Sequence, residues 1–90
     1  MGIEMKDFYK NKVVLITGNT GFKGTWLTQI LLDFQARVIG YALKPNTQPS
    51  LFEQIEQEKN ITQIYADIRD YKKLKEVFDI YQPEVVFHFA

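Results

Sequence analysis

The sequence predicts an α/β fold in which helices cover a parallel sheet. Short runs of consecutive apolar residues, typical of strands buried on both faces, alternate with amphipathic segments that have helical spacing. The first apolar run is followed at once by a glycine-rich stretch that opens a helix, as at the start of a doubly wound sheet. A chain of 90 residues has room for one small domain.

The composition excludes several classes of function. Lys and Arg total 11, as do Asp and Glu, so charge predicts no nucleic-acid and no membrane partner. The chain has no cysteine, which removes disulfides and thiolate ligands, and we expect no metal site. No apolar run approaches the roughly 20 residues of a membrane span. Residues 1–12 do not resemble a signal peptide, and we expect a cytoplasmic protein.

The first strand is expected at residues 12–16, where the apolar residues are consecutive. Residues 1–11 should form an irregular lead-in, with Phe8 and Tyr9 covering one end of the sheet. Asn11 precedes the strand, and asparagine tolerates the left-handed conformation that a tight turn there needs.

A helix is expected from about residue 22 to 34, and a second strand at 37–41. Helical spacing turns five apolar residues toward the sheet: Trp26, Leu27, Ile30, Leu31 and Phe34. Gly24 in the first turn should allow close helix–strand contact. The connection at 42–49 is long for its class, so we expect it to lie near a ligand.

The second half of the chain continues the alternation. Residues 50–53 have the pattern of a capping box, which predicts a short helix ending near Glu58, before a third strand at 61–66. Asp70 is expected to cap a helix over 71–81. The buried stripe of that helix should consist of Leu74, Val77, Phe78 and Tyr81.

A fourth buried strand is expected at 85–89, after Pro83 ends the preceding helix. Right-handed crossovers then predict the strand order third, second, first, fourth, with the glycine stretch at the switch point. In a complete doubly wound sheet a further strand would pair with the fourth one, whose edge would otherwise be open and apolar. We therefore expect residues 1–90 to be the N-terminal part of one cofactor-binding domain, with the rest of it and a substrate domain following.

The expected ligand site is the stretch at 18–24. It consists of Gly18, Asn19, Thr20, Gly21, Phe22, Lys23 and Gly24. A helix start presents free N–H groups and a positive dipole end, and glycines let a pyrophosphate approach the backbone. A P-loop would need Gly-Lys-Ser/Thr, but Lys23 and Gly24 are transposed, which moves the amine away from the phosphates. The alternative is a glycine-rich turn without a ligand.

The glycine spacing Gly18-x-x-Gly21-x-x-Gly24 is one residue longer than the simple dinucleotide fingerprint. With Thr17 before it, this spacing resembles the extended short-chain dehydrogenase/reductases. The resemblance implies a Rossmann-type sheet and a bound dinucleotide.

Two later segments extend this resemblance. Asp67 and Ile68 follow the third strand, where the family commonly contacts the cofactor's adenine through the carboxylate and the next backbone N–H; alternatively, Asp67 only holds the turn. His88-Phe89-Ala90 matches the start of a His-x-Ala-Ala segment that passes the cofactor ribose in that family. A lone histidine on an apolar strand is usually a core residue, so we take His88 as support and not as a site residue.

The end of the second strand departs from the NAD-binding pattern. Members that prefer NAD often carry an Asp there, which bonds the ribose hydroxyls. No acid lies between Arg37 and Ser50, and Lys44 is the nearby charge. Lys44 suits the 2′-phosphate of NADP, but we favour an ordinary solvated lysine.

A closer resemblance is to the CDP-D-glucose 4,6-dehydratases. It rests on residues 21–27, 38–45, 49–53, 67–70 and 83–88. This family usually lacks the strand-two acid as well and is associated with NAD. The resemblance implies NAD as an internal hydride shuttle, CDP-glucose as the small-molecule partner, a 4-keto-6-deoxy product on the route to bacterial deoxysugars, and a homo-oligomer for the complete protein.

No catalytic residue is expected within these 90 residues. The family's Tyr-x-x-x-Lys pair lies beyond the fourth strand, whereas Tyr71-x-x-x-Lys75 comes too early, on what we interpret as a solvated basic face. Two alternatives stay open. One is another extended member, such as a GDP-mannose dehydratase or a UDP-sugar epimerase. The other is a non-catalytic dinucleotide-binding or redox-sensing module.

Overall fold

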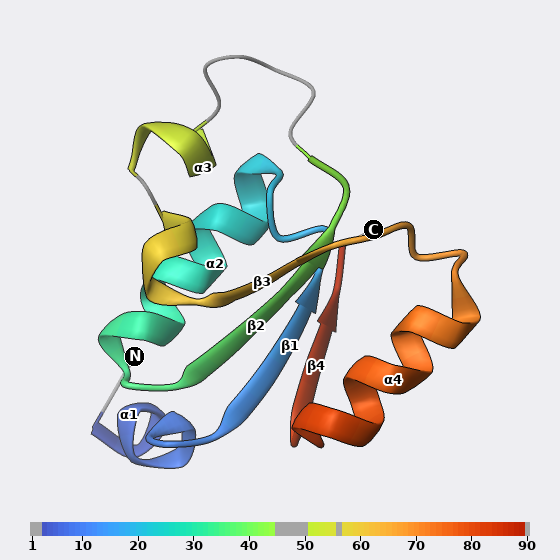
Figure 1. Cartoon of the computed structure of the whole chain (residues 1–90). Coiled ribbons are helices and arrows are strands. Elements are labelled where there is room, and N and C mark those ends of the chain that lie inside the picture. Colours follow the sequence, from blue (N-terminus) through green and yellow to red (C-terminus); the bar gives the residue numbers. More distant parts are fainter. Residues whose placement is uncertain (1–2, 45–50, 56, 90) are drawn as a thin grey trace.

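The computed structural model describes residues 3–44, 51–55 and 57–89 (Figure 1). The elements in chain order are α1 (Ile3–Tyr9), β1 (Val13–Thr17), α2 (Phe22–Asp33), β2 (Arg37–Ala42), α3 (Leu51–Gln54), the 3₁₀ turn η1 (Gln57–Asn60), β3 (Thr62–Tyr65), α4 (Tyr71–Tyr81) and β4 (Val85–His88). The strands form one parallel sheet in the order β3-β2-β1-β4, which confirms the predicted order. In Figure 1, α2 and α3 lie on one side of the sheet and α4 on the other.

The consecutive apolar runs of β1 and β2 are buried on both faces of the sheet, as predicted. Val14 and Val38 pack on the side of α2, where they join Leu31. Leu15 and Ile39 pack on the side of α4. Alternate side chains of β1 and β2 therefore enter two separate apolar clusters, because successive residues of a strand point to opposite faces.

The expectation of an irregular lead-in is wrong for residues 3–9, which form α1. The Tyr9 ring stacks on Phe34 at 6.2 Å, so a contact with the distant end of α2 orders this segment. Asn11 does adopt the predicted left-handed conformation, with φ of 64°. Its N–H donates to the Gln35 carbonyl at 3.0 Å, and this contact fixes the turn that precedes β1.

The predicted inner face of α2 is confirmed in part: Leu31 and Phe34 are buried, and Leu27 packs against the core cluster around Val14. The placement of Trp26 on that face is wrong. Trp26 is 51% exposed, whereas the buried residues are Gly24, Thr25, Thr28 and Leu31. The Thr28 hydroxyl donates to the Gly24 carbonyl at 2.7 Å, which satisfies the hydroxyl inside the protein. These small residues allow a close approach that an indole ring would prevent, and so Trp26 lies outside.

The segment before β3 forms two short pieces, α3 and η1, instead of one helix ending near Glu58. Residues 45–50 lie outside the described residues, so the predictions for the capping box and for most of the connection at 42–49 are not tested. Strand β3 occupies 62–65 and is one residue shorter at each end than predicted.

Helix α4 has the predicted start. The Asp70 carboxylate accepts a hydrogen bond from the Lys73 N–H at 3.1 Å. The helix ends at Gln82, which is left-handed with φ of 47° and precedes Pro83. Both boundaries therefore follow from local side-chain and backbone chemistry.

The surface next to β4 is more exposed than predicted. Phe78 of α4 is 39% exposed and Val86 of β4 is 46% exposed, although both were expected to be buried. Strand β4 lies at an edge of the sheet, so the described residues cover it incompletely. Val77 is buried, while Leu74 and Tyr81 are half-buried against the cluster around Leu15.

We expect Asp70→Ala to lower the free energy of unfolding by about 1 kcal/mol, because the Lys73 N–H loses its cap. Urea denaturation of the full-length protein measures the change. Asp79→Ala is the matched control. It removes an exposed carboxylate of the same helix that pairs with Lys75 at 3.1 Å, and should change stability by no more than about 0.5 kcal/mol. Equal losses in the two variants would contradict a capping role.

Candidate functional site

Two segments predicted to meet a ligand lie at the same edge of the sheet. The loop at 18–21 follows the carboxyl end of β1, and the turn at 66–70 follows that of β3. Strand β2 lies between β1 and β3, while β4 lies on the other side of β1. The chain therefore changes direction beside β1, and this switch point is where open α/β sheets bind ligands.

The loop makes a tight turn at Gly18. Gly18 has φ of 72°, a left-handed conformation that favours glycine. Its N–H donates to the Tyr41 carbonyl at 2.9 Å, and its carbonyl accepts from the Gly21 N–H at 3.3 Å. A Cβ on Gly21 would meet only the Gly18 carbonyl oxygen, at 3.6 Å, so space is open above this residue.

Helix α2 begins without a side-chain cap. Its N-cap is Gly21, in an extended conformation with φ of −76°, and its first turn contains no acid. The first helical hydrogen bond runs from the Thr25 N–H to the Gly21 carbonyl at 2.9 Å. The N–H groups of Phe22, Lys23 and Gly24 therefore have no partner within the helix. They stand at the positive end of the helix dipole, an arrangement suited to an anion.

Threonine hydroxyls hold the loop in shape. Thr20 donates to the Leu43 carbonyl at 3.0 Å, which ties the loop to the chain leaving β2. The Thr25 hydroxyl lies 2.7 Å from the Gly21 carbonyl oxygen and 3.2 Å from that of Asn19. Phe22 is 70% exposed, so its side chain stands clear of these contacts. Lys23 is also exposed.

Gly24 packs so closely against the turn before α2 that a side chain would not fit there. A Cβ there would lie 2.6 Å from the Cα of Asn19 and 2.7 Å from the Gly18 carbonyl oxygen. The predicted close approach is thus made to the preceding turn and not to a strand. Asn19 is fully buried, and its amide pairs with Gln63 of β3. This orientation leaves the backbone of Asn19, and not its side chain, for a ligand.

The turn after β3 is held by Asp67. Its Oδ1 accepts from the Arg69 N–H at 2.9 Å and from Arg69 Nε at 3.0 Å, while Oδ2 accepts from Nη2 at 2.7 Å. These hydrogen bonds, first to the guanidinium and then to the backbone, lower the pKa of Asp67 to about 2. The carboxylate therefore stays charged at neutral pH. Ile68 is half-buried and lines a groove beside this turn.

Tyr41 joins the two segments, a role that the sequence did not reveal. Its carbonyl holds Gly18, and its hydroxyl donates to the Asp67 carbonyl at 2.9 Å. Burial, and then the charges of Asp70 and Asp67, raise the pKa of Tyr41, so the hydroxyl keeps its proton. The only hint of this role in the sequence was that a tyrosine lies at the end of the second strand, where proteins that prefer NAD often carry an Asp.

A largely apolar groove of about 470 Å³ opens at the switch point between α4, β1 and β4. Its lining includes Thr17, Ile68, Val86 and His88. His88 Nδ1 and Thr17 Oγ1 are 2.6 Å apart and hydrogen-bonded, so the histidine is exposed but anchored to β1. His88 therefore lies at the edge of the groove and not in the core, where a lone histidine on an apolar strand is usually found.

Two lysines were considered in the sequence analysis, Lys44 as a possible binder of the NADP 2′-phosphate and Lys75 as part of a Tyr-x-x-x-Lys spacing. Lys44 is exposed, and its ammonium lies 5.7 Å from the centre of the Tyr65 ring. Lys75 pairs with Asp79 at 3.1 Å, and Tyr71 is 82% exposed at the start of α4. The Tyr71–Lys75 spacing thus belongs to a solvated helix face, as predicted.

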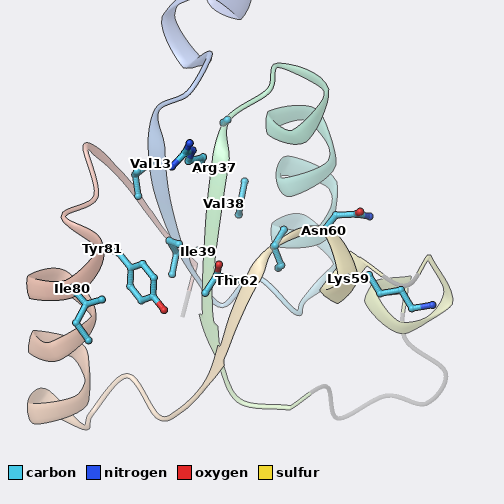
Figure 2. A pocket seen from close by; sticks show the side chains of 11 residues that line it. Val13, Arg37, Val38, Ile39, Lys59, Asn60, Thr62, Ile80 and Tyr81 are labelled. Carbon is cyan, nitrogen blue, oxygen red and sulfur yellow. The ribbon is translucent and has the colours of Figure 1, made fainter.

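A second cavity, of about 640 Å³, lies at the opposite edge of the sheet (Figure 2). Figure 2 shows Val13, Arg37 and Thr62 at the starts of their strands, with Tyr81 from α4 and Lys59 from η1. It is open and far along the strands from the glycine loop, so we do not assign the cofactor to it. Within the described ranges, no helix is long and apolar enough to cross a membrane, and no group of three His, Cys, Asp or Glu side chains gathers as metal ligands.

Comparison with known proteins identifies the relatives of this chain. Residues 15–90 match the family described as GDP-mannose 4,6-dehydratase. CDP-glucose 4,6-dehydratase of Salmonella typhimurium is 45% identical over 85 residues, which are 94% of this chain and 24% of that protein. The chain thus spans about a quarter of the length of this relative.

Solved structures share the fold of this chain. An epimerase of Methanothermobacter thermautotrophicus superposes with a TM-score of 0.79 at 35% identity, over 98% of this chain and 25% of the other. A Bordetella bronchiseptica enzyme solved in complex with NAD⁺ superposes with a TM-score of 0.71 at 28% identity, over 88% of this chain and 25% of the other. The cofactor of that complex agrees with the prediction of NAD. The chain therefore belongs to the GDP-mannose 4,6-dehydratase family, among nucleotide-sugar dehydratases and epimerases with a Rossmann-type sheet.

Proposed function

We propose that this chain is the N-terminal, NAD-binding part of a nucleotide-sugar 4,6-dehydratase. The observation that carries the proposal is the start of α2, where Gly21 leaves the helix uncapped and three backbone N–H groups without a helical partner. A pyrophosphate is the group of a dinucleotide that such a helix start binds. In this proposal 18–24 hold the diphosphate, and the rest of the cofactor domain and the substrate domain lie in further chain.

The same proposal assigns the adenine to the turn after β3. The Asp67 carboxylate is charged, half-exposed and fixed by Arg69, so it is ready to accept from an exocyclic amine. The Ile68 N–H would donate to the adenine ring beside it. Bound NAD supplies a hydride acceptor that is regenerated within one turnover. The residues described here bind and orient it, and the acid and base of the reaction are proposed to lie beyond them.

The substrate we propose is CDP-D-glucose, converted to CDP-4-keto-6-deoxy-D-glucose. Its support is the 45% identity to the Salmonella enzyme that bears this name. A second candidate function is epimerisation of a nucleotide sugar, which the likeness to the Methanothermobacter epimerase favours. We further propose that the protein works in the cytoplasm as a homo-oligomer.

Incubation of the full-length protein with CDP-glucose tests the substrate. A dehydratase forms a 4-keto-6-deoxy product, which absorbs in alkali and is lighter than the substrate by one water. An epimerase instead returns a sugar of unchanged mass. Absence of the keto product from CDP-glucose, together with its formation from GDP-mannose or dTDP-glucose, would contradict the CDP-glucose assignment and keep the dehydratase.

We expect Gly21→Asp to separate stability from binding. Gly21 already has the extended backbone of an N-cap, so an aspartate would cap α2 and raise the free energy of unfolding by about 0.5 kcal/mol. The same carboxylate would occupy the free N–H groups and repel a diphosphate, weakening NAD binding at least about tenfold. Denaturation and calorimetric titration with NAD measure the two effects.

Gly21→Asn is the matched variant, because asparagine caps the helix without a charge. It should weaken NAD binding less than Gly21→Asp does. If the aspartate variant folds and binds NAD as tightly as the unmodified protein, the loop does not hold the diphosphate.

We expect Lys44→Ala to change the affinity for NAD by less than about twofold. Its ammonium lies over the Tyr65 ring. The phosphate that it would bind is the 2′-phosphate of NADP, which NAD lacks. Parallel titrations with NAD and NADP measure the preference. A protein that binds NADP more tightly, and loses this preference in the alanine variant, would make Lys44 a phosphate-binding residue.

A further inference from the structure

Three residues from three segments meet behind the glycine loop, on the α2 side of the sheet. Asn19 comes from the loop, Gly40 from β2 and Gln63 from β3. Asn19 Nδ2 donates to Gln63 Oε1 at 2.6 Å, and Gln63 Nε2 donates to Asn19 Oδ1 at 3.4 Å. The two amides therefore bond in both directions, and Asn19 is fully buried.

The pair occupies the space that a side chain at Gly40 would fill. A Cβ on Gly40 would come within 2.5 Å of Gln63 Oε1 and still closer to Asn19 Nδ2. Gly40 and Gln63 are register partners in the parallel pair of β2 and β3, so they lie side by side. Glycine weakens the interior of a strand, and one there marks a close approach by another group. In this chain that group is the amide pair.

Asn19 also contacts the start of α2, so it connects the amide pair to that helix. Its Cα lies directly beneath Gly24, where a Cβ would approach to 2.6 Å, and its carbonyl lies 3.2 Å from the Thr25 hydroxyl. A shift of Asn19 would therefore move the residues that carry the free N–H groups. The pair also ties the loop to β3, the strand that leads into Asp67.

We propose that Gln63 and Gly40 are positioning residues for the diphosphate site, acting through Asn19. The inference rests on the proposed function, because it needs the loop to hold the NAD diphosphate. Neither residue touches the cofactor. Gln63 holds the buried amide of Asn19 in one orientation, and Gly40 provides the room, so the loop has its binding shape before the ligand arrives.

The test is Gln63→Leu in the full-length protein. Leucine leaves the Asn19 amide buried without a partner, so the loop is expected to shift and the Kd for NAD to rise about tenfold. With NAD at saturation kcat should return to that of the unmodified enzyme, because the substituted residue takes no part in the chemistry. If Gln63→Leu does not fold, Gln63→Asn replaces it, since its amide is one methylene too short to reach Asn19. Gly40→Ala should change NAD binding in the same direction.

Gln57→Leu is the matched control. Gln57 is also a buried glutamine, but its Nε2 donates to the Thr25 carbonyl of α2 at 2.9 Å, whereas the Gln63 amide bonds to Asn19 of the loop. This variant should lose stability and keep its Kd for NAD within about twofold. An equal rise in Kd for both glutamine variants would mean that any loss of α2 stability weakens NAD binding, and it would overturn the inference.

The outcomes separate the two proposals. If the unmodified protein does not bind NAD, the proposed function fails. If it binds NAD and a folded Gln63→Leu variant binds equally well, the proposed function stands and the positioning role is refuted.

Discussion

The close approach of α2 to the turn before it is the constraint on which the site depends. Gly24 lies so near the Asn19 backbone and the Gly18 carbonyl that no side chain fits between them. This packing holds the first turn of α2 over the carboxyl end of β1, with its free N–H groups facing outward from the sheet edge. A helix set further from the turn would have a different first turn and no fixed anion site.

The helices α2 and α4, on opposite faces of the sheet, differ in how the free N–H groups of their first turns find partners. Helix α4 begins with the Asp70 carboxylate on the Lys73 N–H, a cap supplied by the chain itself. Helix α2 begins at Gly21, where no side chain does this. Glycine at this position makes α2 less stable than a capping aspartate would, by about 0.5 kcal/mol. The difference is explained if a ligand takes the place of the cap at α2.

Strand β2 connects the two halves of the site on both of its faces. On the α4 side, Tyr41 reaches from the Gly18 N–H to the Asp67 carbonyl. On the α2 side, Gly40 accommodates the contact between Asn19 and Gln63. Successive residues of one strand thus tie the loop after β1 to β3 and to the turn that follows it. The order β3-β2-β1 makes this possible, because β2 lies between the strands that carry the two segments.

The sequence by itself determined the α/β class, the strand order, the glycine loop and the cap at Asp70, because each depends on local spacing or on handedness rules. It did not determine that Thr28 is buried and Trp26 exposed, because the two residues point to nearly opposite sides of α2 and the apolar pattern favoured the side of Trp26. Nor could it reveal Gln63 as the partner of Asn19, 44 residues away. Such contacts form when the strands are brought side by side, so tertiary structure alone decided how the loop is held.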